Sequence, residues 1–62
     1  MVSLYGDPDA ERFLALLADA EAGADDVLTR MRELAAESEA VALLLEEDDR
    51  VAVRYALVED AP

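Results

Sequence analysis

The segment 40–58 reads AVALLLEEDDRVAVRYALV, and it admits two different folds. Residues 40–47 are mostly strong helix formers and could continue a helix that begins near residue 25. Residues 50–58, in contrast, alternate like a strand and are rich in β-branched side chains. A strand needs a partner, and residues 40–46 are the nearest candidate.

In an antiparallel hairpin with residues 47–49 as its loop, residues 40–46 form the partner strand that residues 50–58 need. The hairpin pairs apolar residues across the strands, Leu45 with Val51, Leu43 with Val53, and Val41 with Tyr55. A shift of the register by one residue scatters these side chains between the two faces. We therefore predict the hairpin. A mostly helical hairpin, in which the second helix continues to about residue 47, is the alternative.

Two helices are predicted upstream of this segment. The first runs from about Pro8 to Glu21, with Asp7 as its N-cap and Gly23 as its stop. Its apolar stripe consists of Ala10, Phe13, Leu14 and Leu17. The second begins near Asp25, and its apolar face consists of Val27, Leu28, Met31, Leu34 and Ala35. With a short strand at residues 2–5, the predicted fold is one α+β domain over residues 1–62, in the order β-α-α-β-β.

Composition narrows the possible functions. The chain has 62 residues, 16 acidic against 5 basic, a net charge of −11, and neither histidine nor cysteine. It therefore lacks the commonest general base and the best protein nucleophile, so we expect no enzyme activity. We also expect no metal site, because residues 7–12 place Arg12 where the calcium-loop pattern requires glycine. No cofactor is expected either, since the chain has only two glycines and no glycine-rich phosphate loop. The negative charge disfavours nucleic acids and anionic membranes as partners.

The sequence also bears on where the protein is located and on the salt concentration around it. It shows no signal-peptide pattern at residues 1–6, and its apolar runs, such as residues 40–45, are far shorter than a membrane span, so a cytoplasmic protein is expected. Lys, Asn and Ile are absent and acidic residues are in excess, as in proteins from salt-saturated cytoplasm. The carboxylates could therefore serve solvation in brine instead of binding.

The back of the predicted sheet is the first candidate for a binding surface. It is mostly small and apolar, and a face of this kind is normally covered in a soluble protein. A protein partner or a homodimer is expected to cover it. With Tyr5, a candidate interface aromatic, the predicted interface residues are Tyr5, Ala42, Leu44, Ala52, Arg54 and Ala56.

These features lead to the hypothesis of a small acidic module for protein–protein interaction that acts as an adaptor, an inhibitor or an accessory subunit. A sharper version makes it a mimic of nucleic acid that blocks a basic site on its partner. The acidic face for that role consists of Asp19, Asp26, Glu33 and Glu37.

A second hypothesis comes from a family resemblance. Residues 27–34 (VLTRMREL), followed by a hairpin that ends in residues 51–57 (VAVRYAL), resemble the recognition helix and wing of winged helix-turn-helix regulators. This resemblance implies a dimeric DNA-binding regulator. Thr29, Arg30 and Arg32 would then face the major groove, and Arg50 or Arg54 would contact phosphate.

Overall fold

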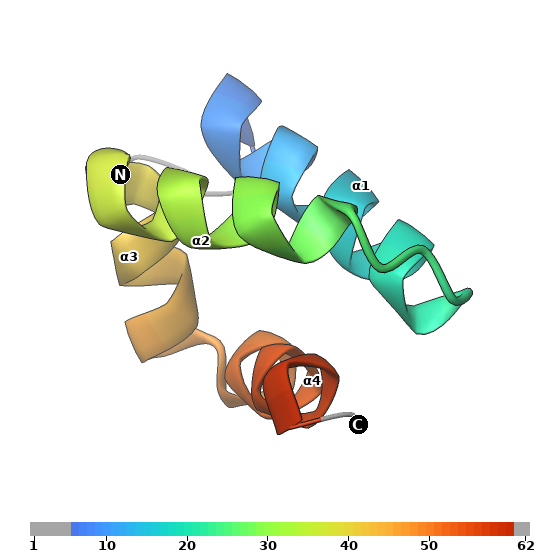
Figure 1. Cartoon of the computed structure of the whole chain (residues 1–62). Coiled ribbons are helices and arrows are strands. Elements are labelled where there is room, and N and C mark those ends of the chain that lie inside the picture. Colours follow the sequence, from blue (N-terminus) through green and yellow to red (C-terminus); the bar gives the residue numbers. More distant parts are fainter. Residues whose placement is uncertain (1–5, 61–62) are drawn as a thin grey trace.

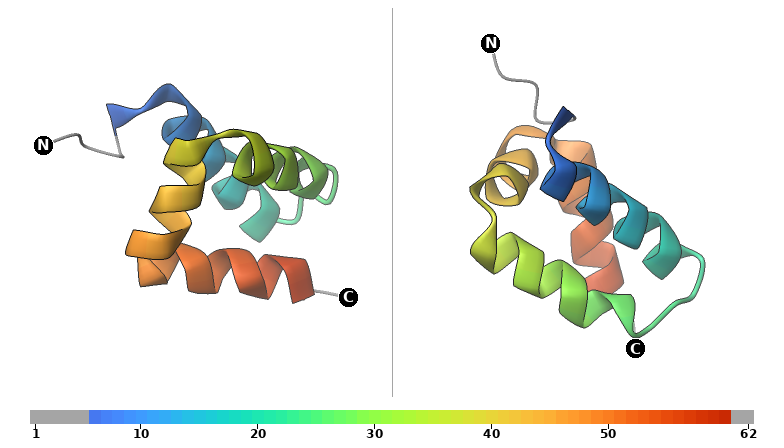
Figure 2. Two further views of the ribbon diagram at one scale, coloured as in Figure 1. Left: turned by 90° about the vertical axis from the view of Figure 1, so that its left-hand side faces the viewer. Right: turned by 90° about the horizontal axis from the view of Figure 1, so that it is seen from above.

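Figure 1 shows the computed structural model of the chain, which describes residues 6–60. This part of the chain forms four α-helices: α1 (Pro8–Glu21), α2 (Val27–Glu37), α3 (Glu39–Glu47) and α4 (Asp49–Asp60). Helices α1 and α2 lie side by side as an antiparallel pair, and α3 leads away from them across one end (Figure 2). Helix α4 then returns beneath the pair.

The first helix has the predicted bounds, and its ends follow from local chemistry. Asp7 Oδ1 accepts a hydrogen bond of 2.9 Å from the backbone N–H of Asp9, and Pro8 occupies the first turn, where no N–H is needed. After the helix, Gly23 has a φ of 111°, a conformation that other residues rarely adopt. The predicted N-cap and the predicted stop of α1 are both confirmed.

Helix α2 begins slightly later than predicted. Its N-cap is Asp26, whose side chain makes no capping hydrogen bond, and its first residue is Val27. The predicted apolar face does turn inward, with Met31 fully buried at its centre. The other members of that face are partly buried: Val27, Leu28, Leu34 and Ala35.

The predicted hairpin is wrong, because residues 39–60 form two helices and the structure contains no strand within residues 6–60. The two helices begin at side-chain caps. Ser38 Oγ accepts from the N–H of Val41 at 3.4 Å, and Asp48 Oδ1 accepts from the N–H groups of Arg50 and Val51 at 3.1 and 3.4 Å. The acidic segment 47–49, predicted as a hairpin loop, is therefore the junction of two helices.

The core shows why the helical solution prevails. It consists of Ala10, Phe13, Leu17, Met31, Val41, Leu44 and Val51. Val41 and Leu44 are three residues apart, which is the spacing of a helix face and not of a strand face. Leu43 and Val53, which the hairpin would bury, remain 44% and 58% exposed.

These findings correct two expectations about the fold. The described chain is all-α and not α+β, and without a hairpin it has no wing, so the resemblance to winged helix-turn-helix regulators does not extend to the structure. In the alternative prediction helix two continued to about residue 47. Residues 39–47 are indeed helical, but Ser38 is extended and separates them from α2. The strand predicted at residues 2–5 lies outside the described residues.

Candidate interaction site

Helix α4 packs against the rest of the molecule with one side only. Val51 is buried, and Tyr55 and Val58 are partly buried against the core, at the i, i+4, i+7 spacing of one helix face. The Tyr55 ring meets the buried ring of Phe13 in α1 edge to face, with the centroids 5.3 Å apart and the planes inclined by 69°. The opposite side of α4 therefore faces away from the core.

Two ion pairs connect α4 to the first two helices. Arg54 Nε lies 3.1 Å from Oε1 and 3.2 Å from Oε2 of Glu21 in α1, and its Nη2 also donates to Oε1. Arg32 Nε in α2 lies 3.2 Å from Oε2 of Glu59 in α4. Exposed pairs of this kind contribute little stability individually. Together with the Tyr55 ring contact, they connect the inward side of α4 and its flanks to the rest of the molecule.

These contacts shift three pKa values. The hydrogen bond from Arg54 lowers the pKa of Glu21, and the same bond raises the pKa of the guanidinium. Burial, followed by the negative charge of Glu59, raises the pKa of the Tyr55 hydroxyl. Arg54 and Glu21 are thus each stabilised in their charged form, whereas Tyr55 is stabilised in its neutral form.

The outward side of α4 carries a row of four exposed residues, Arg50, Val53, Leu57 and Asp60, which we call the α4 outer face. Their successive spacings of three, four and three residues place them along one side of the helix. Val53 is 58% exposed and Leu57 is 67% exposed. An apolar pair thus lies between a cation in the first turn of α4 and a carboxylate in its last turn.

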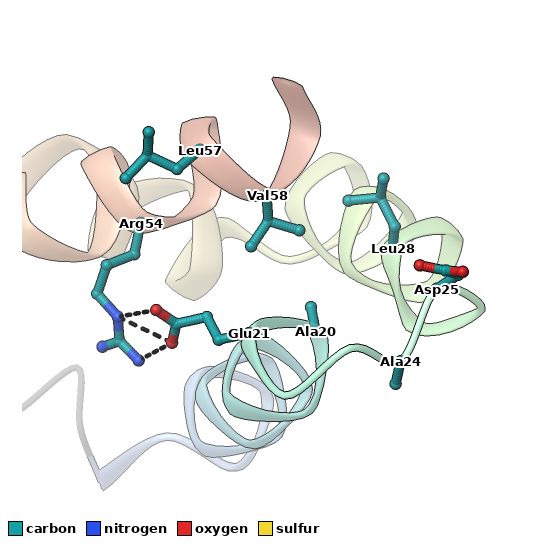
Figure 3. Close-up of a pocket in the computed structure, with 8 residues that line it drawn as sticks. All are labelled: Ala20, Glu21, Ala24, Asp25, Leu28, Arg54, Leu57 and Val58. Atoms are coloured by element: carbon teal, nitrogen blue, oxygen red, sulfur yellow. Dashed lines mark hydrogen bonds and ion pairs between the residues drawn. The ribbon is translucent and has the colours of Figure 1, made fainter. Parts of the chain in front are cut away.

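A groove of about 430 Å³ lies beside the α4 outer face (Figure 3). The Arg54–Glu21 ion pair lies at one end of the groove, and Leu28 of α2 lines it farther along. The remaining lining residues are Ala20, Ala24, Asp25, Leu57 and Val58. Because Leu57 belongs to both features, a partner that covers the α4 outer face also borders the groove.

The acidic side chains do not gather into a metal centre in the described part of the chain. Among residues 6–60, no three His, Cys, Asp or Glu side chains form a group that could hold a metal ion. The densest acidic run, residues 46–49, lies where α3 meets α4, and Asp48 there caps α4. No helix in the same range is long and apolar enough to cross a membrane.

The residues predicted for the back of a sheet do not share one surface. Ala42 and Ala56 are exposed but belong to different helices, α3 and α4, and Ala52 is partly buried. Leu44 is fully buried in the core, where a partner cannot contact it. Tyr5 lies outside the described residues. Of the predicted interface, α4 alone supplies more than one accessible residue.

The residues predicted to contact DNA are also dispersed. Thr29, Arg30 and Arg32 are exposed on α2, and Arg54 is exposed on α4. Arg50, the other candidate for a phosphate contact, is also exposed on α4. Of these four arginines, Arg32 and Arg54 are paired with carboxylates of other helices. These two are therefore engaged within the molecule and are not held toward one external surface.

The predicted acidic face is one part of a wider distribution. Asp19 lies on α1, Asp26 precedes α2, and Glu33 and Glu37 lie on α2, all of them exposed. Glu33 and Glu37 line a polar cleft of about 330 Å³, whose other lining residues are Asp9, Arg12, Arg30, Leu34 and Ser38. Acidic residues occur on all four helices, so the charge is not confined to one pair of helices.

The α4 outer face was not among the surfaces predicted from the sequence. The signal was present, because Arg50, Val53, Leu57 and Asp60 show the three-four-three spacing of a helical seam. The hairpin prediction concealed it by placing Val53 on the buried side of a sheet. Interpreted as a helix, residues 49–60 place the same side chain opposite the core.

Comparison of the chain with known protein families, with curated proteins and with solved structures finds no match. Its function is therefore inferred from its own residues.

Proposed function

We propose that the chain is a small non-catalytic module that binds another protein through the α4 outer face. The observation that supports this proposal is the exposure of Val53 and Leu57, four residues apart on the side of α4 that faces away from the core. Covering such side chains is favourable by roughly 25 cal/mol per Å² of apolar surface removed from water. A partner protein provides this cover.

The charges at the two ends of α4 indicate which charged groups that partner should carry. Arg50 lies in the first turn of the helix and Asp60 in its last turn. The helix dipole favours the opposite arrangement, with acidic residues at the start and basic residues at the end. A partner that brings a carboxylate to Arg50 and a cation to Asp60 compensates both charges. We therefore expect an amphipathic helix whose apolar side chains cover Val53 and Leu57.

The composition supports binding over catalysis. The chain contains no histidine and no cysteine, the side chains most often used as general base and nucleophile. Its net charge of −11 favours a protein partner over a nucleic acid, since phosphates repel it. An adaptor, an inhibitor or an accessory subunit performs its role by docking alone.

Two stapled helical peptides test the proposal. Each carries a row of two leucines between an arginine and an aspartate in three-four-three spacing, and the two peptides have opposite charge orders. We expect at least one to bind the wild-type chain in a fluorescence-anisotropy titration. The double variant Val53→Ser/Leu57→Ser should bind it about tenfold more weakly or worse, a loss of about 1.4 kcal/mol.

The matched control is Leu43→Ser, since Leu43 is also an exposed apolar side chain, 44% accessible, but lies on α3. This variant should bind the peptide as the wild type does. Failure of both peptides to bind, or equal binding by the wild type and the double variant, would contradict the proposed function.

A further inference from the structure

We infer that the partner helix is α4 of a second copy of this chain, packed antiparallel about a twofold axis. This inference rests on the proposed function, because it assigns an occupant to the same α4 outer face. In the order of the chain, that face carries a cation, two apolar side chains and a carboxylate: Arg50, Val53, Leu57 and Asp60. A second α4 that runs in the opposite direction presents a carboxylate to Arg50, apolar side chains to Val53 and Leu57, and a cation to Asp60.

An antiparallel crossing midway between Val53 and Leu57 brings four pairs together. Val53 of each copy meets Leu57 of the other, and Arg50 of each copy meets Asp60 of the other. The three-four-three spacing is that of a coiled-coil seam, so all four residues face the partner helix at once. Each charge that is unfavourably placed for the dipole of its own helix then lies beside an opposite charge.

The parallel arrangement fails on charge. It brings Arg50 against Arg50 and Asp60 against Asp60, so both ends of the seam repel. Antiparallel pairing is thus the arrangement that places Arg50 of one copy beside Asp60 of the other at both ends of the seam. The core-facing side of α4 is engaged by the Phe13–Tyr55 contact and by two ion pairs, so the α4 outer face is the side of the helix that a second copy can cover.

The dimer is weak and depends on salt. A seam with two apolar residues per chain buries far less than the about 1,200 Å² of a standard stable interface, so dimer forms only at high protein concentration. Each chain carries a net charge of −11, and this long-range repulsion opposes association at low ionic strength. Added salt screens it beyond about 10 Å at 0.1 M, so the dissociation constant falls as salt rises.

Sedimentation equilibrium of the full chain over a wide concentration range tests this inference. The wild type should approach twice its monomer mass of 6.7 kDa at the highest concentrations. Arg50→Glu sets two carboxylates against each other, and Asp60→Arg sets two cations against each other. Each should weaken the dimer about tenfold or more, a change of about 1.4 kcal/mol. The double variant Arg50→Glu/Asp60→Arg should restore it, because the attracting pairs are re-formed with their charges exchanged.

Charge-matched controls separate this effect from net charge. Arg30→Glu on α2 and Asp19→Arg on α1 alter the net charge of the chain exactly as the two single variants do, at exposed positions off the α4 outer face. Both should associate like the wild type apart from the small effect of net charge. A monomeric wild type at every concentration would overturn the inference, as would single variants that behave like their controls. A double variant that stays weakened would overturn the antiparallel geometry.

Disulfide trapping gives an independent readout of orientation, since the chain has no cysteine of its own. Val53→Cys and Leu57→Cys are prepared separately, mixed and oxidised. Antiparallel packing predicts that the mixed 53–57 product exceeds the half expected from random pairing. Parallel packing predicts an excess of the two products that link identical positions, and that result would overturn the inference.

Failure of this inference is distinguishable from failure of the proposed function. If the chain stays monomeric but a stapled peptide still binds the α4 outer face, the interaction module stands and its partner is another protein. If neither the second copy nor either peptide binds, both proposals fall.

Discussion

Arg54 of α4 donates hydrogen bonds to Glu21, the last residue of α1, with its Nε 3.1 Å from Oε1 and 3.2 Å from Oε2. The two residues are 33 positions apart, and their contact closes the chain from its last helix onto its first. The pair also lies at the edge of the groove beside the α4 outer face. The ion pair that holds α4 against α1 therefore also lines the groove next to Leu57 of the α4 outer face.

The first prediction concerns the pH dependence of this pair. Contact with Arg54 lowers the folded-state pKa of Glu21 below its ordinary value of 4.5. Its contribution to stability is therefore present above 4.5 and is lost as pH falls through the lower folded value. The free energy of unfolding of the wild type should exceed that of Glu21→Gln at neutral pH, and the two should converge in acid. Urea titrations followed by circular dichroism measure this.

Glu33→Gln is the control for this prediction, because Glu33 is an exposed carboxylate of α2 that lines the polar cleft and not the groove beside α4. At neutral pH this variant should retain the stability of the wild type. A Glu21→Gln deficit that persists unchanged in strong acid would show that the side chain acts through shape and not through charge.

The second prediction concerns Tyr55. Burial and the Glu59 carboxylate raise its folded-state pKa above the ordinary 10.0. The stabilisation is fully present below pH 10.0 and is lost as pH rises through the folded value. In Tyr5→Phe, Tyr55 is the one remaining tyrosine, so ultraviolet titration should give a pKa above that of the urea-unfolded chain. Equal pKa values in the two states would contradict the packing of Tyr55 against Phe13.

The third prediction concerns the core. Phe13 is fully buried and contacts the Tyr55 ring, so Phe13→Ala should cost about 3–5 kcal/mol. Domains are stable by about 0.05–0.15 kcal/mol per residue, which is about 3–9 kcal/mol for 62 residues, so this variant should lose a large part of its stability. Val53→Ser, at an exposed site, should change stability by no more than about 0.5 kcal/mol. Thermal unfolding followed by circular dichroism compares them, and similar effects of the two changes would contradict the assigned burial.

The fourth prediction concerns the two caps that make residues 39–60 helical. Ser38→Ala and Asp48→Ala each remove a side-chain acceptor at a helix start and should each cost about 1 kcal/mol. Ser38→Asp keeps an acceptor and should be close to neutral. Nuclear Overhauser contacts in the wild type should follow the i, i+3 pattern across 39–47 and 49–60. Contacts between Leu43 and Val53 in a ladder pattern would instead support the hairpin.

The fifth prediction concerns salt. All 16 acidic residues lie within residues 6–60, and none is buried. We expect the helices to form at low salt, because the caps, the core and two ion pairs do not need added ions. Stability should rise as potassium chloride screens the mutual repulsion of the carboxylates. Far-ultraviolet circular dichroism across a salt series measures this. A chain that stays unfolded until salt is molar would show that its acidity serves solvation in brine.

The sequence by itself determined α1 and the inward face of α2. Asp7, Pro8 and Gly23 mark the ends of α1 through local effects: an acceptor for free N–H groups, a residue that needs no N–H, and a positive φ. The apolar stripe around Phe13 follows one period only, that of a helix. Signals of this kind act within a few residues and do not depend on the rest of the fold.

Tertiary structure decided segment 40–58 and, with it, the candidate site. Val41, Val51 and Tyr55 lie inward in a hairpin as well as in two helices, so these residues cannot discriminate between the folds. The difference lies in Leu44, which is buried only in the helical solution, and in Val53, which is exposed only there. The α1–α2 pair presents a core into which two short helices pack one side each, and burial of a side chain depends on that shared surface. The spacing of apolar residues in segment 40–58 fits both a strand and a helix, so it does not show which of these side chains become buried.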